Sequence, residues 1–389
     1  MGIIARVGKI LDFFPLSKTI VLESIPDFAC NTYPVYQKLR EALPSHSFVW
    51  LVHKRTKNSL PGSKAVYTGK DRTFWEFFLH QWYLSRCCVM ISSNGFECKR
   101  TRKQLFLFLT HGSKTKKTRG MYEMGDLVDF INVQSHFFDD IIAYEYNCRK
   151  EQLVYLGYPR CDFFFSRKRP DVRALTQTAS DEKYVIWLPT FRATKAGRID
   201  AQSETYGNIG MPIVYSLDKL NELNSFLAGI RLHILFKPHP AQDMSSVKTA
   251  KLSNFHLISD DDVAKAGLQL YEAIAGSEAL ITDYSSVFFD YLLLDHPIAT
   301  TTDDIESWKS GRGFAFDIEK MYDRATVRVK DQDELTSFLK SVSDGADEKA
   351  SGRREVRDIT NMHVDGNSAE RVAGFICDFL GEKRRPARG

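Results

Sequence analysis

Residues 281–297 read ITDYSSVFFDYLLLDHP, and they combine the end of an apolar strand with the start of an apolar helix. The run 279–282 is short and continuously apolar, which is typical of a buried strand. Ser285 and Ser286 follow it and precede the helical segment. The first N–H groups of a helix lack internal partners, so small hydroxyl residues at this position favour an anion-binding turn. The same pattern also fits an ordinary serine N-cap.

Outward from this stretch, short apolar runs alternate with polar, helix-compatible segments along most of the chain. Continuously apolar runs predict parallel strands that are covered on both faces. The fold class predicted by this alternation is α/β, with two doubly wound, Rossmann-type domains that face each other across a cleft. The predicted strands span residues 19–25, 48–53, 88–92, 105–110, 130–134, 153–156, 184–188, 232–236, 255–258, 279–282 and 298–301.

The expected domain boundaries follow from length and composition. With 389 residues, the chain is long enough for two separate cores. A polar stretch over 167–183 is the predicted linker between them. We therefore expect an N-terminal α/β domain over 1–166, a C-terminal α/β domain over 184–367, a helix over 368–382 that packs back on the first domain, and a basic tail over 383–389.

Composition excludes several classes of protein. A hydrophobic content of 43% and a net charge of +4 are ordinary for a globular protein. No apolar run reaches the roughly 18 residues needed to span a bilayer, and the chain start lacks the pattern of a signal peptide. The seven cysteines are scattered without a Cys-x-x-Cys pair, so neither a disulfide framework nor a zinc ribbon is predicted. We expect a cytoplasmic protein with reduced thiols.

The two chain ends suggest contact with a membrane surface. Residues 1–15 predict a short basic amphipathic helix that is limited by Pro15, and the tail is also basic. Such a helix either packs on the protein's own core or lies at an anionic membrane surface. The basic tail is either solvated or in contact with the same lipids. These features lead to an expected peripheral location on the inner face of the cell membrane.

Basic and small residues follow the predicted strand 105–110. His111 comes first, and Gly112 then allows the backbone to turn sharply near a ligand. No carboxylate lies between Glu97 and Glu123, whereas eight Lys or Arg residues occur over 99–119, which predicts a positive field suited to phosphate groups. No recognition helix, finger motif or aromatic-studded strand accompanies this cluster, so no nucleic-acid partner is expected. Alternatively, His111 is a structural residue of the turn and the lysines form a solvated loop.

Three further strand ends carry polar side chains. The strand 232–236 runs into KPHP at 237–240, where the prolines fix the direction of the histidine. The strand 184–188 is followed by PTFR at 189–192, and Asp283 follows the strand 279–282. Because ligands of open parallel sheets bind beyond the carboxyl ends of the strands, we expect function to lie there. The triplet 260–262 is interpreted as solvated, because nothing at metal-ligand spacing accompanies it.

Together these motifs resemble the CDP-glycerol glycerophosphotransferase family, which makes teichoic acids and related polyol-phosphate polymers in bacteria. The resemblance covers residues 105–371, and its most specific element is TDYSS at 282–286. Other matching elements are His-Gly-Ser at 111–113, GYPR at 157–160, PTFR at 189–192, HP at 239–240, FD at 289–290, DHP at 295–297, RGF at 312–314 and DGNSAER at 365–371. The family fold is GT-B-like, which agrees with the two domains predicted above.

The chain departs from the family pattern around the first histidine. Thr110 occupies the usual place of a tryptophan, and Ser113-Lys114-Thr115 replaces Thr-Pro-Leu. These residues border the acceptor side, so the acceptor and the polyol stay open. Because the chain has little room for the extra regions of many polymerising members, we expect a short, primase-type member that adds one or a few units.

The resemblance implies a reaction in which an acceptor hydroxyl attacks the phosphorus that carries the glycerol of CDP-glycerol, and CMP leaves. It implies His111 as the general base and His239 as a group that stabilises diphosphate charge, roles that suit histidine because its side chain titrates near neutral pH. The remaining donor-side candidates are Lys237, Asp283, Ser285, Ser286, Thr190 and Arg312. The acceptor-side candidates are Gly112, Ser113, Lys114 and Lys116.

The expected partners are a CDP-polyol (CDP-glycerol or CDP-ribitol), an undecaprenyl-diphosphate-linked acceptor and an anionic membrane surface. Neither a tightly bound cofactor nor a protein metal site is expected, although a diffusible Mg²⁺ can accompany the diphosphate. Two alternatives remain. The first is a ribitol-phosphate transferase or a nucleotide-sugar glycosyltransferase of the same fold, and the second is a non-catalytic protein that binds anionic polymers or membranes. The sequence leaves the oligomeric state open.

Overall fold

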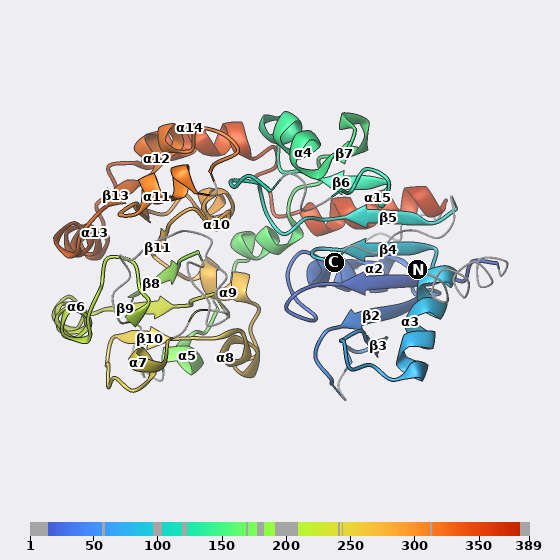
Figure 1. The fold of residues 1–389 in the computed structure, drawn as a ribbon, viewed down its shortest axis with the longest axis horizontal. Helices are drawn as coiled ribbons and strands as arrows, with labels where there is room; N and C mark the ends of the chain where they lie inside the picture. The colour runs from blue at the N-terminus through green and yellow to red at the C-terminus, as the bar shows by residue number, and fades with distance from the viewer. Residues whose placement is uncertain are drawn as a thin grey trace. The chain divides into compact units, whose positions relative to one another are not determined.

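The computed structural model describes the chain as two compact units, each built around one parallel sheet (Figure 1). The described residues are 15–56, 59–95, 103–118, 123–168, 170–176, 183–190, 209–239, 242, 244–311 and 313–381. The first unit combines Met1–Ser113, Thr118–Phe165 and Met362–Gly389, and the second combines Lys114–Lys117 and Ser166–Asn361. The predicted α/β class with two parallel-sheet domains is thus confirmed.

The first unit contains a seven-stranded parallel sheet in the spatial order β3-β2-β1-β4-β5-β6-β7. Its strands are β1 (Thr19–Glu23), β2 (Ser47–Val52), β3 (Ser63–Tyr67), β4 (Val89–Ser92), β5 (Leu105–Phe108), β6 (Phe130–Asn132) and β7 (Leu153–Val154). On one face of the sheet, α2 (Thr32–Ala42) and α15 (Ser368–Leu380) share a core with the strands, in which Tyr36 and Val372 are buried together with Trp50. The other helices are α3 (Phe74–Arg86) and α4 (Asp139–Tyr146), with short 3₁₀ segments η1 (His136–Phe138), η2 (Lys150–Gln152) and η3 (Pro159–Phe165).

The second unit contains a six-stranded parallel sheet in the order β10-β9-β8-β11-β12-β13. Its strands are β8 (Lys183–Leu188), β9 (Leu232–Phe236), β10 (Phe255–Leu257), β11 (Ala279–Thr282), β12 (Ile298–Thr301) and β13 (Val327–Val329). The core includes the rings of Trp187, Phe236 and Phe255, with Trp187 packed edge-to-face against both phenylalanines. Its helices are α5 (Arg173–Thr176), α6 (Leu217–Gly229), α7 (Ser245–Lys248), α8 (Asp260–Lys265), α9 (Leu270–Ala275), α10 (Val287–Tyr291), α11 (Ile305–Ser310), α12 (Glu319–Ala325), α13 (Gln332–Asp344) and α14 (Ala350–Thr360), with the 3₁₀ segment η5 (Leu292–Leu294).

Both sheets reverse their strand order at one point, which is the usual location of a ligand in doubly wound folds. The reversal lies between β1 and β4 in the first unit and between β8 and β11 in the second. All strand pairs are parallel, so within each unit the carboxyl ends of the strands meet at one edge of the sheet. We call these the first edge and the second edge, and both carry the residues described below.

Two strands, β3 and β13, were not predicted, and each lies at the border of its sheet. β3 is mostly half-exposed, and β13 has only three residues, including Arg328. Their sequences, SKAVY and VRV, are interrupted by a lysine or an arginine and so lack the continuous apolar run on which the prediction depended.

Some expected boundaries also differ from the structure. Lys114–Lys117 were expected in the first domain, but they belong to the second unit because Lys116 forms an antiparallel bridge with Phe314. The second unit ends at Asn361 rather than at 367, and the expected linker 167–183 contains α5. Apart from Pro15, the amphipathic helix expected over 1–15 and the basic tail over 383–389 lie outside the described residues.

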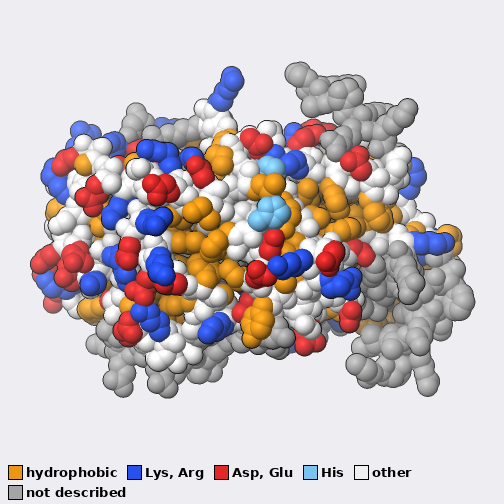
Figure 2. All heavy atoms as spheres, turned by 90° about the horizontal axis from the view of Figure 1, so that it is seen from above, with side chains coloured by type: hydrophobic (Ala, Val, Ile, Leu, Met, Phe, Trp, Pro, Cys, Tyr) orange, Lys and Arg blue, Asp and Glu red, His pale blue; other side chains and the backbone are white. Residues whose placement is uncertain are grey.

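The surface offers two observations about a membrane partner. Within the described ranges, no helix has the length and apolar character needed to cross a bilayer. On the face seen in Figure 2, acidic and basic side chains lie interspersed over the molecule.

Candidate functional site

At the second edge, Asp283 connects the ends of β8 and β11. Its carboxylate accepts hydrogen bonds from the Thr190 backbone N–H at 2.9 and 2.8 Å, one on each oxygen. Its carbonyl oxygen accepts the Tyr322 hydroxyl at 2.6 Å, and the Asp283 side chain is fully buried. Asp283 was expected to orient a donor group or a ligand hydroxyl. The structure places its carboxylate between two exit loops, where it holds the backbone of the candidate donor-side residue Thr190.

The next residues bring the serine pair to the surface of the same edge. Tyr284 is buried, its hydroxyl donates to Asp304 at 2.9 Å, and its ring lies 5.1 Å from that of Trp308. Ser285 and Ser286 follow this anchor and are partly exposed. Ser286 is the N-cap residue of α10, yet its side chain makes no capping hydrogen bond. Its hydroxyl is therefore not committed to the helix.

The helix behind the serines is shorter than the sequence suggested. α10 has five residues and continues as the 3₁₀ segment η5. A helix macrodipole grows from aligned peptide units, so a helix of this length adds little positive potential. Local N–H groups and hydroxyls are then the main donors that this turn can offer to an anion.

In the KPHP segment after β9, the two candidate residues Lys237 and His239 have different surroundings. Lys237 forms an ion pair with Asp260 at 3.0 Å, and the lysine side chain is only 11% exposed. His239 is exposed. The triplet 260–262 was interpreted as solvated, and Asp261 and Asp262 are indeed exposed. Asp260 differs, because it is partly buried and pairs with Lys237. Lys237 is consequently anchored by a carboxylate.

Residues Lys114–Lys117, which include the expected acceptor-side lysines, belong to the second unit. Thr115 donates its hydroxyl to the Tyr284 carbonyl at 3.1 Å. The Lys116 ammonium lies 4.8 Å from the centre of the Trp308 ring, a cation–π distance, and Lys114 is half-buried. A cavity of about 240 Å³ lies nearby and is lined by Lys117, Lys309, Gly313, Phe314, Phe316, Asp317, Ile318 and Glu319. Arg312 lies outside the described residues.

At the first edge, His111 follows β5 on a tightly turned backbone and its side chain is exposed. Thr110 has φ +59° and Gly112 has φ +127°, both in the region that favours glycine. The Thr110 hydroxyl donates to Tyr158 at 3.1 Å and helps to hold this conformation. Ser113 was expected on the acceptor side; it is buried, and its hydroxyl donates to Gln134 at 2.6 Å.

Asn31, a residue that the sequence analysis missed, connects His111 to two distant segments. It is fully buried and its amide donates to the carbonyl oxygens of Thr110 at 3.0 Å and Leu109 at 3.4 Å. Its side-chain oxygen accepts the backbone N–H of Arg160 at 3.1 Å. Arg160 had been noted as part of GYPR without a role. Asn31 therefore ties the loop after β5 to the starts of α2 and η3.

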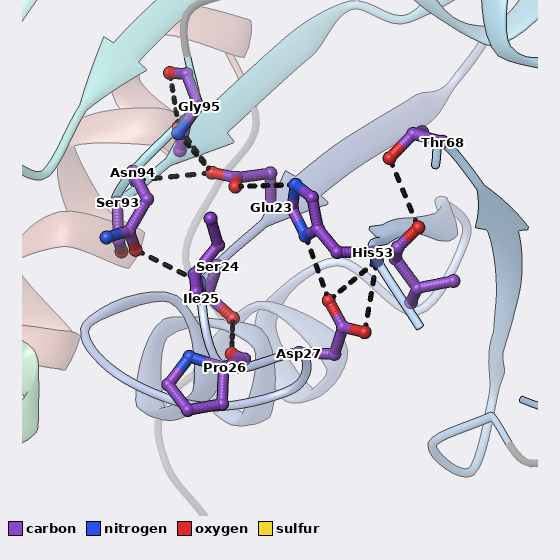
Figure 3. Close-up of polar contacts among 12 residues, drawn as sticks. Glu23, Ser24, Ile25, Pro26, Asp27, His53, Thr68, Ser93, Asn94 and Gly95 are labelled. Atoms are coloured by element: carbon purple, nitrogen blue, oxygen red, sulfur yellow. Dashed lines mark hydrogen bonds and ion pairs between the residues drawn. The ribbon is translucent and has the colours of Figure 1, made fainter. Parts of the chain in front are cut away.

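A second missed group at the first edge contains one imidazole between two carboxylates (Figure 3). His53 Nδ1 lies 3.0 Å from Asp27 Oδ1, and His53 Nε2 lies 3.5 Å from Glu23 Oε1. The hydrogen bond to Asp27 and the charge of Glu23 outweigh burial and raise the pKa of His53. Glu23 is buried and accepts hydrogen bonds from Ser92 and Gly95, both at 2.7 Å. His53 ended a predicted strand, which was the only sequence signal for this group.

Within the part of the chain that the structure describes, no group of three or more His, Cys, Asp or Glu side chains is placed to hold a metal ion.

Comparison with known proteins places this site in a family. The family described as CDP-Glycerol:Poly(glycerophosphate) glycerophosphotransferase matches residues 10–378. The teichoic acid poly(glycerol phosphate) polymerase of Bacillus subtilis (strain 168) is 24% identical over 352 residues, which cover 84% of this chain and 44% of that protein. The chain thus spans less than half the length of this relative.

Two other comparisons cover most of both proteins. The teichoic acid ribitol-phosphate primase of Bacillus spizizenii (strain ATCC 23059 / NRRL B-14472 / W23) is 26% identical over 377 residues, covering 90% of this chain and 88% of that protein. The solved structure of the wall teichoic acid polymerase TagF superposes with a TM-score of 0.73 at 21% identity, covering 97% of this chain and 94% of that one. At this identity the likeness establishes the fold.

Proposed function

Because the chain belongs to the CDP-glycerol:poly(glycerophosphate) glycerophosphotransferase family, we propose that it transfers glycerol phosphate from CDP-glycerol to a hydroxyl of a lipid-linked acceptor and releases CMP. The observation that carries the proposal is the extent of the family match, 10–378, which includes every residue of the candidate site. Family membership also confirms the resemblance drawn from the motifs.

In the proposed reaction the acceptor oxygen forms a bond to the phosphorus that carries glycerol, and the bond from that phosphorus to the oxygen of CMP breaks. The first unit supplies the base, since His111 is exposed at a strand end and can take the hydroxyl proton on Nε2. The pair of electrons from the broken bond stays on CMP. Positioning and charge stabilisation supply most of the rate in transfers of this kind.

The second unit is proposed to bind the donor. Ser285 and Ser286 are partly exposed and would donate to the diphosphate, together with the N–H groups of their turn. His239 is exposed and would stabilise charge on the leaving phosphate, while Lys237 contributes less because Asp260 already pairs with it. Asp283 acts indirectly through the Thr190 loop.

We further propose that the acceptor is an undecaprenyl-diphosphate-linked saccharide at the inner face of the membrane. Helix α3 supports this location, because Phe74 and Trp75 are 73% and 69% exposed. Along the helix, the ring of Phe78 contacts those of Trp75 and Trp82. The guanidinium carbon of Arg86 lies 5.0 Å from the centre of the Trp82 ring. Aromatic side chains next to a cation are typical of the membrane–water interface.

The activity test is incubation with CDP-glycerol and a synthetic undecaprenyl-type disaccharide, with product mass and CMP release as readouts. His111→Ala should lower turnover by about 100-fold or more while leaving the fold intact. His136→Ala is the matched control, because His136 is an exposed histidine of the same unit that pairs with Asp139. Full activity of His111→Ala would remove the base assignment, and an EDTA arm measures any contribution of Mg²⁺ on the diphosphate.

Transfer of ribitol phosphate is the second candidate, and the similarity to a ribitol-phosphate primase favours it. A panel of CDP-glycerol, CDP-ribitol and nucleotide sugars, scored by nucleotide release, distinguishes the two polyols and a glycosyltransferase. A chain that binds anionic polymer but releases no nucleotide from any donor would instead support the non-catalytic alternative.

Membrane binding is tested by sedimentation with anionic vesicles. Phe74→Ser/Trp75→Ser should lose most of the bound fraction. Tyr144→Ser is the control, since Tyr144 is a 57% exposed aromatic residue on α4 of the same unit. Equal binding by both variants would exclude α3 as the contact.

A further inference from the structure

The sulfur of Cys30 lies between the imidazole of His111 and the guanidinium of Arg160. Cys30 Sγ is 3.6 Å from His111 Nδ1 and 3.4 Å from Arg160 Nη1. The same Nη1 group donates to the carbonyl oxygen of His111 at 3.2 Å. We call these three residues the thiol cluster. In this arrangement Nδ1 of His111 faces the sulfur, and Nε2 is the nitrogen directed away from it.

The backbone around the thiol cluster is held in an uncommon conformation. Cys30 has φ +58° and Thr110, the neighbour of His111, has φ +59°. Residues other than glycine persist in this region only where the surrounding structure fixes them. Asn31 supplies that constraint, because its buried amide bonds to Thr110 and to the backbone of Arg160. The cluster is therefore a built arrangement of three segments, and not a chance contact of one cysteine.

The charges around the sulfur favour its ionised form. Burial alone would raise the pKa of the Cys30 thiol, but the positive charge of Arg160 and the contacts with His111 outweigh burial and lower the pKa to about 6. A pKa of about 6 favours the thiolate over the thiol at neutral pH. A thiolate only accepts hydrogen bonds, so the proton between Sγ and Nδ1 must belong to the imidazole.

We propose that Cys30 is a positioning residue, whose thiolate holds His111 as the tautomer protonated on Nδ1 and leaves Nε2 as the base. This inference rests on the proposed function, in which His111 takes the acceptor proton. A carboxylate has the same role toward the histidine of serine hydrolases, where it fixes the tautomer and stabilises the imidazolium that forms. Here the sulfur anion has that role, and Arg160 keeps it ionised.

The tautomer of His111 can be measured without any activity. In protein labelled with ¹⁵N-histidine, long-range ¹H–¹⁵N spectra distinguish Nδ1–H from Nε2–H, and His111→Gln assigns the signal. We expect Nδ1–H in the wild type and a shift toward Nε2–H in Cys30→Ala. An Nε2–H tautomer in the wild type would overturn the proposal.

Thiol reactivity gives an independent measurement. The rate of alkylation by iodoacetamide follows the thiolate fraction, so Cys30 should label with a midpoint near pH 6, and Arg160→Gln should move that midpoint upward. Cys148 is the internal control, because burial raises its pKa to about 11. Peptide mass spectrometry reads both sites in one sample. Equal labelling of Cys30 and Cys148 at pH 6.5 would contradict an ionised sulfur.

Kinetics then links the cluster to the reaction. Cys30→Ala should lower kcat by about 10- to 100-fold with an unchanged KM for the donor, as expected for a residue that orients a functional side chain. Cys30→Asp should recover part of the loss, whereas a merely structural cysteine would not be rescued by a carboxylate. Failure of rescue in a variant with a wild-type melting curve would overturn the role. If the wild type itself releases no CMP, the proposed function fails, while the tautomer and alkylation results still decide the state of the cluster.

Discussion

The loop that carries His111 and the loop that carries Ser285 are fixed by different kinds of buried connector, although each follows a strand of a parallel sheet with one reversal of strand order. At the first edge, the neutral amide of Asn31 fixes the loop of His111, while the buried carboxylate of Glu23 joins the end of β1 to the exit of β4. At the second edge, the carboxylate of Asp283 fixes the loops, and the hydroxyls of Ser285 and Ser286 lie beside it. The shared topology determines where a ligand binds, while the connector influences which chemistry surrounds it. The proposed base lies where the connector is neutral, and the proposed donor site lies where the connector is charged.

The largest effect is expected from removal of the neutral connector. Asn31→Ala leaves two carbonyl oxygens and one N–H without their partner, which should cost about 3 kcal/mol of unfolding free energy at roughly 1 kcal/mol for each hydrogen bond. Transfer activity should fall as well, because the loops that carry Cys30 and His111 lose their link. Urea unfolding and hydrogen exchange over 105–113 measure the two effects.

Asn31→Asp sharpens the comparison because it keeps the shape and changes only the donor. A carboxylate at this position would face the carbonyl oxygens of Leu109 and Thr110, so we expect it to be as destabilising as alanine. A wild-type stability for Asn31→Asp would show that a charged connector suits the first edge equally well.

Removal of the charged connector should have a somewhat smaller effect. Asp283→Ala should cost about 2 kcal/mol, since a hydrogen bond to a charged group contributes about 1.5–3 kcal/mol and Thr190 is partly exposed to water. Asp283→Asn retains an acceptor and should lose less. Hydrogen exchange at 188–190 locates the change, and calorimetry with CDP-glycerol reports the accompanying loss of donor affinity. An intact Thr190 loop in Asp283→Ala would contradict the role assigned to this carboxylate.

The two units should also respond to pH in opposite directions. In the first unit the pKa of His53 is raised above its ordinary value of 6.5, so its contribution is fully present below pH 6.5 and is lost as pH rises through the folded-state pKa. Its effect should stay below about 1 kcal/mol because the side chain is 39% exposed. In the second unit, burial and the neighbouring His233 lower the pKa of His256 to about 4. The unfolded chain therefore gains a proton first as pH falls from 6.5 to 4, and stability decreases by about 1–2 kcal/mol after allowance for partial exposure.

Hydrogen exchange at pH 5 and pH 8 separates these two effects by unit. His53→Gln should remove the alkaline loss in the first unit, and His256→Gln the acid loss in the second. Asp27 should add a loss of stability at acid pH in the first unit. Burial raises the pKa of Asp27, but the hydrogen bonds from His53 and Lys54 lower it overall. Its contribution to stability is therefore lost only as pH falls through a value below 3.8. A uniform response of both units would contradict these assignments.

The sequence predicts those parts of the fold that local pattern determines. Eleven of the thirteen described strands were predicted from apolar runs, whereas β3 and β13 were not, because a lysine or an arginine interrupts each of them. His111 and the serine pair could be located for the same reason, since they follow such runs directly. The family motif then supplied their chemistry.

Residues that act through distant partners could not be predicted in this way. Cys30 meets His111 across 81 positions and Arg160 across 130, and no local pattern marks either contact. The sequence likewise did not predict the ion pair that Lys237 forms with Asp260. Charge pairing of this kind depends on the three-dimensional arrangement of loops, whereas strand and helix patterns depend on neighbours in sequence.

The smallest effect is expected at the hydroxyls of the second edge, and it separates ligand binding from helix capping. Ser285→Ala should weaken binding of CDP-glycerol by about fivefold, which corresponds to one hydrogen bond of about 1 kcal/mol, with little change in stability. Ser216→Ala is the matched control in the same unit, because Ser216 caps α6 by accepting the Lys219 N–H at 3.2 Å. That variant should lose about 1 kcal/mol of stability and keep its donor affinity. If both serines behaved as caps, the second edge would hold its ligand through backbone donors alone, and the difference in chemistry between the two edges would be smaller than proposed here.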